Sequence, residues 1–154
     1  MTSRSRSRRQ RSTLHTYTLL MTFHVIGIVA AFFAQFVFGF VYYSEKVAFN
    51  AWWKAMGNEG KQPGDGGSMP LLFGLTALGG LASVVLTAAL FSFIGGEITL
   101  GTGVGYGLFA GAIAVSISLS HRLFAGHGLT VWTLETIGDL STYAIIGAVL
   151  SFWY

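Results

Sequence analysis

The chain has 154 residues, enough for one domain; 53% of them are hydrophobic, only 10% are charged, and the formal net charge is +3. A soluble domain carries about 25% charged residues, so this composition excludes an ordinary water-soluble domain and indicates an integral membrane protein. Cysteine is absent, which excludes disulfides, thiolate catalysis and cysteine-ligated metal sites.

Residues 1–16 form a basic tail with no acidic residue. Five of the nine basic residues lie in the first eleven positions: Arg4, Arg6, Arg8, Arg9 and Arg11. We expect this tail to bind anionic lipid headgroups, at about 1 kcal/mol per Arg, to dock on a partner subunit, or to act as a topology signal. Nucleic acid is not expected as a partner. The Arg- and Ser-rich composition also fits a mitochondrial transit segment, but the tail runs directly into a long apolar stretch, which disfavours that interpretation.

Four apolar stretches follow the tail, each long enough to cross the hydrocarbon layer, which takes roughly 20 helical residues. They are residues 17–43, 70–94, 100–120 and 131–153. A helix satisfies its own backbone hydrogen bonds in lipid. The sequence therefore predicts an all-α fold, an integral membrane four-helix bundle over residues 17–154. Aromatic residues at the span ends suit the headgroup layer: Tyr42, Tyr43, Trp132, Trp153 and Tyr154.

A short amphipathic helix is predicted over residues 46–56, directly after the first span. Its apolar face follows the i, i+3, i+4, i+7 pattern and consists of Phe49, Trp52, Trp53 and Met56. Lys46, Asn50 and Lys54 lie on the other face. We expect this helix to lie in the membrane interface, anchored by its aromatic face. The glycine-rich segment that follows, residues 57–68, is predicted to be a polar loop.

The distribution of basic residues indicates an orientation. An even number of spans places both termini on one side, together with the five tail arginines. Four basic residues lie on the other side: Lys46, Lys54, Lys61 and Arg122. Because basic residues near span ends favour the cytoplasm, we expect both termini to be cytoplasmic. A bacterial inner membrane is the expected location, with an organellar membrane as the alternative.

The third stretch carries glycines at strict four-residue spacing: Gly103, Gly107 and Gly111. Small residues at this spacing let helix backbones approach closely in lipid. We expect this stripe to pack within the bundle, with a homodimer or partner interface as the alternative.

Glu135 and Asp139 lie four residues apart in the fourth stretch and so share one helix face. A charge inside the bilayer is costly, so both acids should face protein or water. Arg122 emerges on the same side of the membrane and is a candidate partner. We interpret the acids as a structural polar clamp with Arg122 and with His121 or His127. A proton or cation pathway and a site for a cationic or polar ligand are the alternatives.

Few other polar residues are candidates for a site. His24 and Gln35 are the polar residues of the first stretch. His24 is expected to be a packing residue that forms hydrogen bonds, with a metal or pigment ligand as the alternative. His121 and His127 flank a glycine-rich turn, but their spacing does not match a zinc site, and no metal is expected. The sequence contains no metalloprotease, P-loop, nucleophile-elbow or dinucleotide-binding motif, so catalysis is not expected.

Two segments resemble a known family. The first is FVFGFVYYSEKVAFNAWWKAMG, residues 36–57, and the second is IIGAVLSFW, residues 145–153. They resemble the DUF1761 family, small membrane proteins of unknown function. In that family the first span ends in a Gly-x-x-Trp/Tyr-Tyr-Ser motif, and an aromatic segment then closes on Trp-x-x-x-Met-Gly. The corresponding residues here are Gly39, Tyr42, Tyr43, Ser44, Trp52, Met56 and Gly57. The resemblance implies Asn and His one turn apart where this chain has Glu135 and Asp139.

These observations predict a non-catalytic structural or accessory subunit of a larger membrane protein complex. The alternative is a small transporter or a proton- or cation-conducting protein that uses the acidic pair. Membrane lipids and other membrane subunits are the expected partners. No cofactor is expected beyond bound lipid; contact with a pigment or haem is not indicated.

Overall fold

The computed structural model describes residues 24–63, 65 and 67–154. Over these residues the fold is all-α and contains no strand, as the sequence predicts. The helices are a first one at His24–Tyr42, then α2 (Phe49–Ala55), α3 (Met69–Ile94), α4 (Leu100–Phe124) and α5 (Gly128–Leu150). The basic tail and residues 17–23 of the predicted first span lie outside the described residues.

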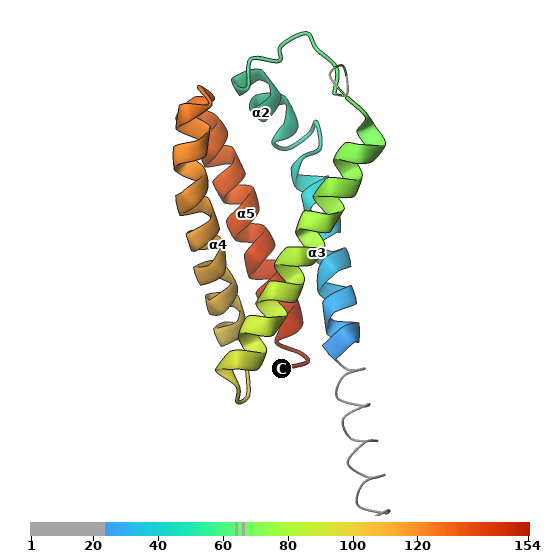
Figure 1. The fold of residues 1–154 in the computed structure, drawn as a ribbon, viewed down its shortest axis with the longest axis vertical. Helices are drawn as coiled ribbons and strands as arrows, with labels where there is room; N and C mark the ends of the chain where they lie inside the picture. Colours follow the sequence, from blue (N-terminus) through green and yellow to red (C-terminus); the bar gives the residue numbers. More distant parts are fainter. Residues whose placement is uncertain (1–23, 64, 66) are drawn as a thin grey trace, which may run out of the picture.

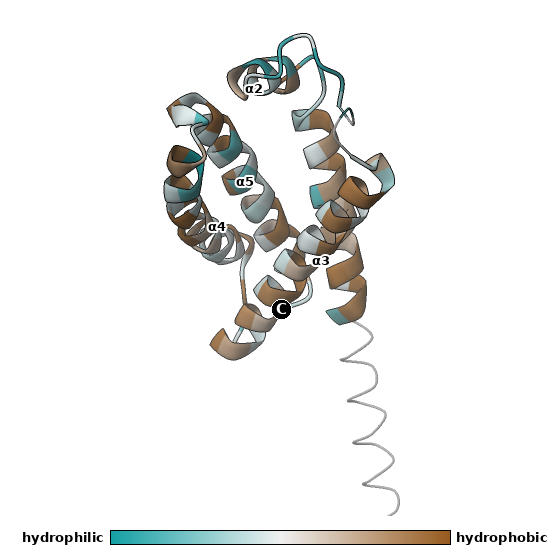
Figure 2. Ribbon diagram, turned by 45° about the horizontal axis from the view of Figure 1, so that its top comes forward, coloured by the Kyte–Doolittle hydropathy of each residue, from teal (hydrophilic) through white to brown (hydrophobic). Residues whose placement is uncertain are grey.

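Three of the helices are long and apolar enough to cross a membrane: His24–Tyr42, α3 and α4. The 23-residue α5 has a comparable length but carries Glu135 and Asp139, and it is not among these candidates. Figure 2 shows the difference, because hydrophilic residues interrupt α5 while α3 is almost uniformly hydrophobic. The structure therefore establishes three candidate spans.

The long helices run side by side between two ends of the molecule (Figure 1). One end, called here the α2 end, contains α2, the polar loop after it and the turn between α4 and α5. The other, called here the C-terminal end, contains the start of the first helix, the turn between α3 and α4, and Tyr154. The turn between α3 and α4 contains Gly95 and Gly96 at φ +67° and +79°, a conformation that favours glycine.

Three helices have boundaries that differ from the predicted ones. Helix α2 covers Phe49–Ala55, shorter than the predicted 46–56. Helix α4 continues to Phe124, beyond the predicted end at residue 120, so His121 and Arg122 lie in its last turn. Basic side chains there interact favourably with the carboxyl end of the helix, so the end of the apolar run does not mark the end of the helix. Helix α5 covers Gly128–Leu150, three residues ahead of the predicted 131–153 at each end.

Helices α4 and α5 pack closely through glycine. Gly103 and Gly107 of α4 lie directly against Gly147 of α5, and Gly111 lies against the Tyr143 side chain. A Cβ atom added to Gly103 would lie 2.6 Å from the carbonyl oxygen of Gly147, and one added to Gly107 would overlap the Tyr143 carbonyl. This face of α4 is therefore occupied by α5 of the same chain.

The apolar core lies toward the C-terminal end. It consists of Ala31, Val84, Ala88, Phe91, Ile98, Ile146 and Leu150. Tyr154 covers one end of this core. Its ring packs edge-on against His24, at a centroid distance of 4.3 Å, and against Phe91, at 5.7 Å. Trp153 covers Gly27. Two predicted headgroup-layer aromatics and the intramembrane His24 are thus in contact with protein side chains.

Candidate functional site

The acidic residue Glu135 is the centre of a polar cluster at the α2 end. It lies in the second turn of α5, and only 8% of its surface is exposed. Its Oε2 accepts a hydrogen bond from Arg122 Nε at 2.6 Å, and its Oε1 accepts one from Trp52 Nε1 at 3.0 Å. Both carboxylate oxygens are therefore bound by side chains from two other helices.

Arg122 reaches Glu135 from the last turn of α4. The turn between α4 and α5 reverses the chain at Gly126, where φ is +77°, and so brings the end of one helix beside the start of the next. The Arg122 side chain is 35% exposed, and its Nη1 lies 3.4 Å from Nδ1 of His127. The structure thus brings together Arg122, Glu135 and His127 of the predicted cluster. His121 is exposed and lies outside it.

The end of the first helix is attached to the same part of α5. The Tyr42 hydroxyl donates a hydrogen bond to the carbonyl oxygen of Leu134 at 2.7 Å. Gly138 makes room for this contact: a Cβ atom there would lie 2.8 Å from the Tyr42 ring and 3.3 Å from the Tyr43 hydroxyl. Two tyrosines of the predicted headgroup layer therefore pack directly on α5.

Helix α2 presents its aromatic face to the bundle. The four predicted anchor residues, Phe49, Trp52, Trp53 and Met56, are half-buried, while Asn50 and Lys54 are exposed. Trp52 packs edge-on against Tyr43 with centroids 5.6 Å apart, and the Phe49 and Trp53 rings stack at 5.5 Å. The predicted amphipathic face exists, and through Trp52 it makes a specific bond to α5.

Asp139 lies one turn below Glu135 and is half-buried. Within the described part of the chain its carboxylate forms no hydrogen bond or ion pair shorter than 4 Å. The predicted polar clamp therefore includes Glu135 and Arg122 but does not include Asp139 as a bonded member.

The cluster is an ion pair between Glu135 and Arg122, in which the Trp52 indole donates a hydrogen bond to the second carboxylate oxygen. A buried carboxylate is stable as a charge only when its oxygens are paired, and here a guanidinium and an indole N–H complete that pairing. Removing one partner of such a pair is more destabilising than the pair is stabilising. No group of three or more His, Asp or Glu side chains suited to a metal ion occurs among residues 24–63, 65 and 67–154.

Several contacts of the site leave no local signal in the sequence. Trp132 donates from Nε1 to the carbonyl oxygen of Val115 at 3.0 Å, and the Tyr143 hydroxyl lies 3.5 Å from Ser83 Oγ. Gln35 is buried against Gly80. The sequence identifies Trp132 only as an interface aromatic and Gln35 only as a polar residue of the first span, and their partners lie 17 or more residues away.

A family model described as "Protein of unknown function (DUF1761)" matches residues 26–151. The chain belongs to the DUF1761 family. This match confirms the resemblance seen in residues 36–57 and 145–153, and it covers all the helices that form the site. Searches of curated proteins and of solved structures each find no match. In this DUF1761 member the motif residues Tyr42 and Trp52 form hydrogen bonds to α5.

Proposed function

We propose that this DUF1761 protein is a four-span integral membrane protein that acts as a non-catalytic structural or accessory subunit of a larger membrane complex. The observation that carries the proposal is the pairing of both Glu135 oxygens, one by Arg122 and one by Trp52. A carboxylate whose charge is balanced by a guanidinium and whose oxygens both accept from other helices fixes those helices to one another.

The proposal treats α5 as the fourth span. At 1.5 Å per residue, its 23 residues extend about 34 Å, which is longer than the roughly 30 Å hydrocarbon layer. It packs along α4 from Trp132, which binds Val115, to Ser151, which contacts Gly103. Because α4 is itself a candidate span, a helix packed along it crosses the same layer. The paired state of Glu135 lowers the cost of its charge at that depth.

Four spans put both termini on one side, and the five tail arginines favour the cytoplasmic face of a bacterial inner membrane. The same tail supplies a basic segment for anionic lipid or for an acidic surface on a partner subunit. The apolar core at the C-terminal end supports a structural role, because it separates the polar cluster from the opposite end of the bundle.

Purification from native membranes in mild detergent tests this proposal. The expected result is co-purification of defined partner chains in stoichiometric amount, reduced when the five tail arginines are replaced by Ala. A control variant with Lys46, Lys54 and Lys61 replaced by Ala, on the other side of the membrane, should retain the partners. A protein that purifies alone from crosslinked native membranes would contradict the proposal.

A small transporter or a proton-conducting protein is the second candidate. The half-buried Asp139 carboxylate, without a bonded partner among the described residues, favours it. Proton flux into liposomes, lost in Asp139→Asn with Glu135→Gln and retained in Glu59→Gln, would support this function. Flux equal to that of empty liposomes would exclude it.

A further inference from the structure

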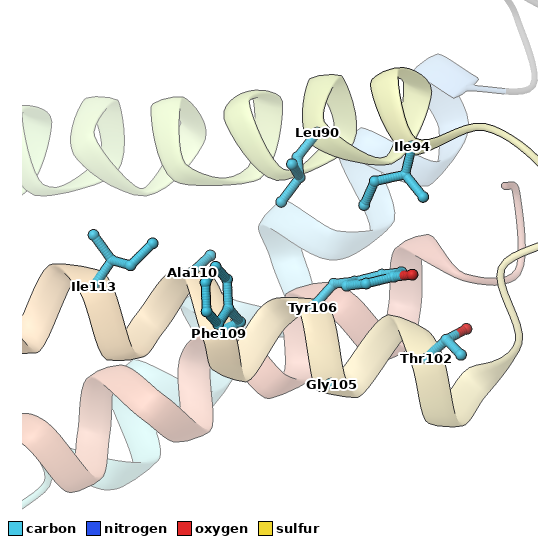
Figure 3. A pocket seen from close by; sticks show the side chains of 8 residues that line it. All are labelled: Leu90, Ile94, Thr102, Gly105, Tyr106, Phe109, Ala110 and Ile113. Carbon is cyan, nitrogen blue, oxygen red and sulfur yellow. The ribbon is translucent and has the colours of Figure 1, made fainter.

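An apolar groove lies between α3 and α4 on the outside of the molecule. Its volume is about 660 Å³, and it is lined by Leu90, Ile94, Thr102, Gly105, Tyr106, Phe109, Ala110 and Ile113. Figure 3 shows the α3 side chains pointing across the groove toward those of α4. The two helices share a tight turn and then diverge toward the α2 end (Figure 1), which leaves the space between them open.

The groove faces the hydrocarbon layer, because both of its walls are candidate membrane spans. Phe109 and Ile113 are 66% and 52% exposed, so the groove is open at the outer surface of these two helices. Water is not a stable occupant of an apolar groove at this depth, which leaves a lipid or a helix of another protein.

The dimensions of the groove decide between these occupants. From Thr102 to Ile113 it follows α4 for about 16 Å, which is close to half of the roughly 30 Å hydrocarbon thickness, the depth of one leaflet. A membrane-spanning helix extends over the whole layer of about 30 Å, whereas one acyl chain of a phospholipid is confined to one leaflet. The length of the groove therefore favours an acyl chain.

One polar group points to the same occupant. The Tyr106 ring packs on Phe91, with centroids 6.0 Å apart, and its hydroxyl points along the groove toward the end where α3 joins α4 (Figure 3). Within the described residues this hydroxyl has no hydrogen-bond partner. Tyr106 lies six residues into α4, about 9 Å from the helix start. Its hydroxyl therefore lies toward the α3–α4 end of the groove, the end at which a phospholipid of that leaflet carries its ester oxygens.

We infer that the groove between α3 and α4 binds one acyl chain of a phospholipid from the leaflet at the C-terminal end, with the Tyr106 hydroxyl donating a hydrogen bond to its ester oxygen. Gly105 is the floor of this site, since a Cβ atom there would meet no neighbour within 4 Å. The inference requires that α3 and α4 cross the membrane; it does not depend on the proposed accessory role.

Photo-crosslinking in bilayers of phosphatidylglycerol and phosphatidylethanolamine tests this inference. A phospholipid with a diazirine on its acyl chain is added, and adducts are mapped by mass spectrometry. Adducts should concentrate on Leu90, Phe109 and Ile113 relative to Phe93, an 88% exposed residue of α3 outside the groove. The variant Gly105→Phe, which fills the groove, should lose the groove adducts and keep those at Phe93.

Two further variants complete the test. Gly74→Phe places the same ring at another open, exposed glycine, on α3 and outside the groove, and should leave the pattern unchanged. Tyr106→Phe should lower the groove adducts about two- to tenfold at limiting lipid, as expected for one lost hydrogen bond. Groove adducts no more frequent than those at Phe93, or unaffected by Gly105→Phe, would overturn the inference, as would a crosslinked partner helix in the groove.

Discussion

The indole Nε1 of Trp52 donates a hydrogen bond to Glu135 Oε1 over 3.0 Å, although 83 residues separate them in the chain. The other oxygen of the same carboxylate accepts from Arg122. One side chain of α5 therefore joins α2 and α4. This relationship attaches α2 to the other helices and makes the polar cluster the structural junction of the α2 end.

The first prediction concerns the charge of Glu135. Replacing it in Glu135→Gln leaves Arg122 without its anion, while an amide oxygen still accepts from Trp52. Because Arg122 is 35% exposed and water compensates in part, we expect a loss of about 1–2 kcal/mol in the free energy of unfolding. The measurement is a denaturant titration in detergent micelles, followed by circular dichroism.

The matched control is Glu59→Gln, which breaks the ion pair with Lys54 at 3.0 Å, where the side chains are 69% and 71% exposed. An exposed pair of this kind contributes less than about 1 kcal/mol, so this variant should unfold nearly as the unmodified protein does. Equal losses in the two variants would show that the Glu135–Arg122 pair contributes no more to the free energy of unfolding than an exposed ion pair does.

The second prediction concerns the indole N–H of Trp52. The variant Trp52→Phe keeps an aromatic ring against Tyr43 and removes only the donor to Glu135. We expect α2 to detach more often, which raises hydrogen–deuterium exchange across Phe49–Ala55. In the control variant Trp53→Phe, the lost bond is to the carbonyl oxygen of Lys61, and the faster exchange should appear in residues 57–63 instead. If hydrogen–deuterium exchange in α2 is unchanged in Trp52→Phe, the hydrogen bond from Trp52 to Glu135 does not hold α2 on the other helices.

The third prediction compares two glycines two residues apart in α4. In Gly107→Ala the new methyl group meets the Tyr143 backbone carbonyl, so α4 and α5 must separate, and we expect a loss of about 2–3 kcal/mol. In Gly105→Ala the methyl group meets open space, and a gain of up to about 1 kcal/mol is expected from helix propensity. Thermal unfolding in micelles measures both, and the same sign for the two variants contradicts this packing.

The fourth prediction concerns the topology. The sequence contains no cysteine, so single cysteines introduced one at a time report exposure to either side of the membrane. With four spans, a membrane-impermeant maleimide added to intact cells should label Lys61→Cys and Gly126→Cys, while Glu97→Cys should react only after the membrane is opened. A cysteine after α5, Phe152→Cys, should likewise react only after the membrane is opened. Labelling of Phe152→Cys in intact cells would remove α5 from the spans, and labelling of Lys61→Cys and Gly126→Cys only in opened membranes would reverse the orientation.

The sequence alone was sufficient for the all-α membrane character, the family and the approximate helices. These properties depend on apolar runs, amphipathic spacing and short motifs, each contained in a few tens of consecutive residues. The helix ends were less accurate, because apolarity ends at residue 120 while the backbone hydrogen bonding of α4 continues to Phe124. The proximity of Arg122 to Glu135 was anticipated, since a single turn separates their helices.

The tertiary structure decided which partner each side chain meets. Trp52 belongs to the predicted anchoring face of α2, but its indole donates to Glu135. Asp139 shares a helix face with Glu135 but takes no part in its ion pair. Gly105 lines the groove between α3 and α4, whereas Gly107 is buried against α5. These distinctions depend on how the helices are rotated and how far they diverge. Local periodicity defines the faces of one helix; only packing against the others determines what each face contacts.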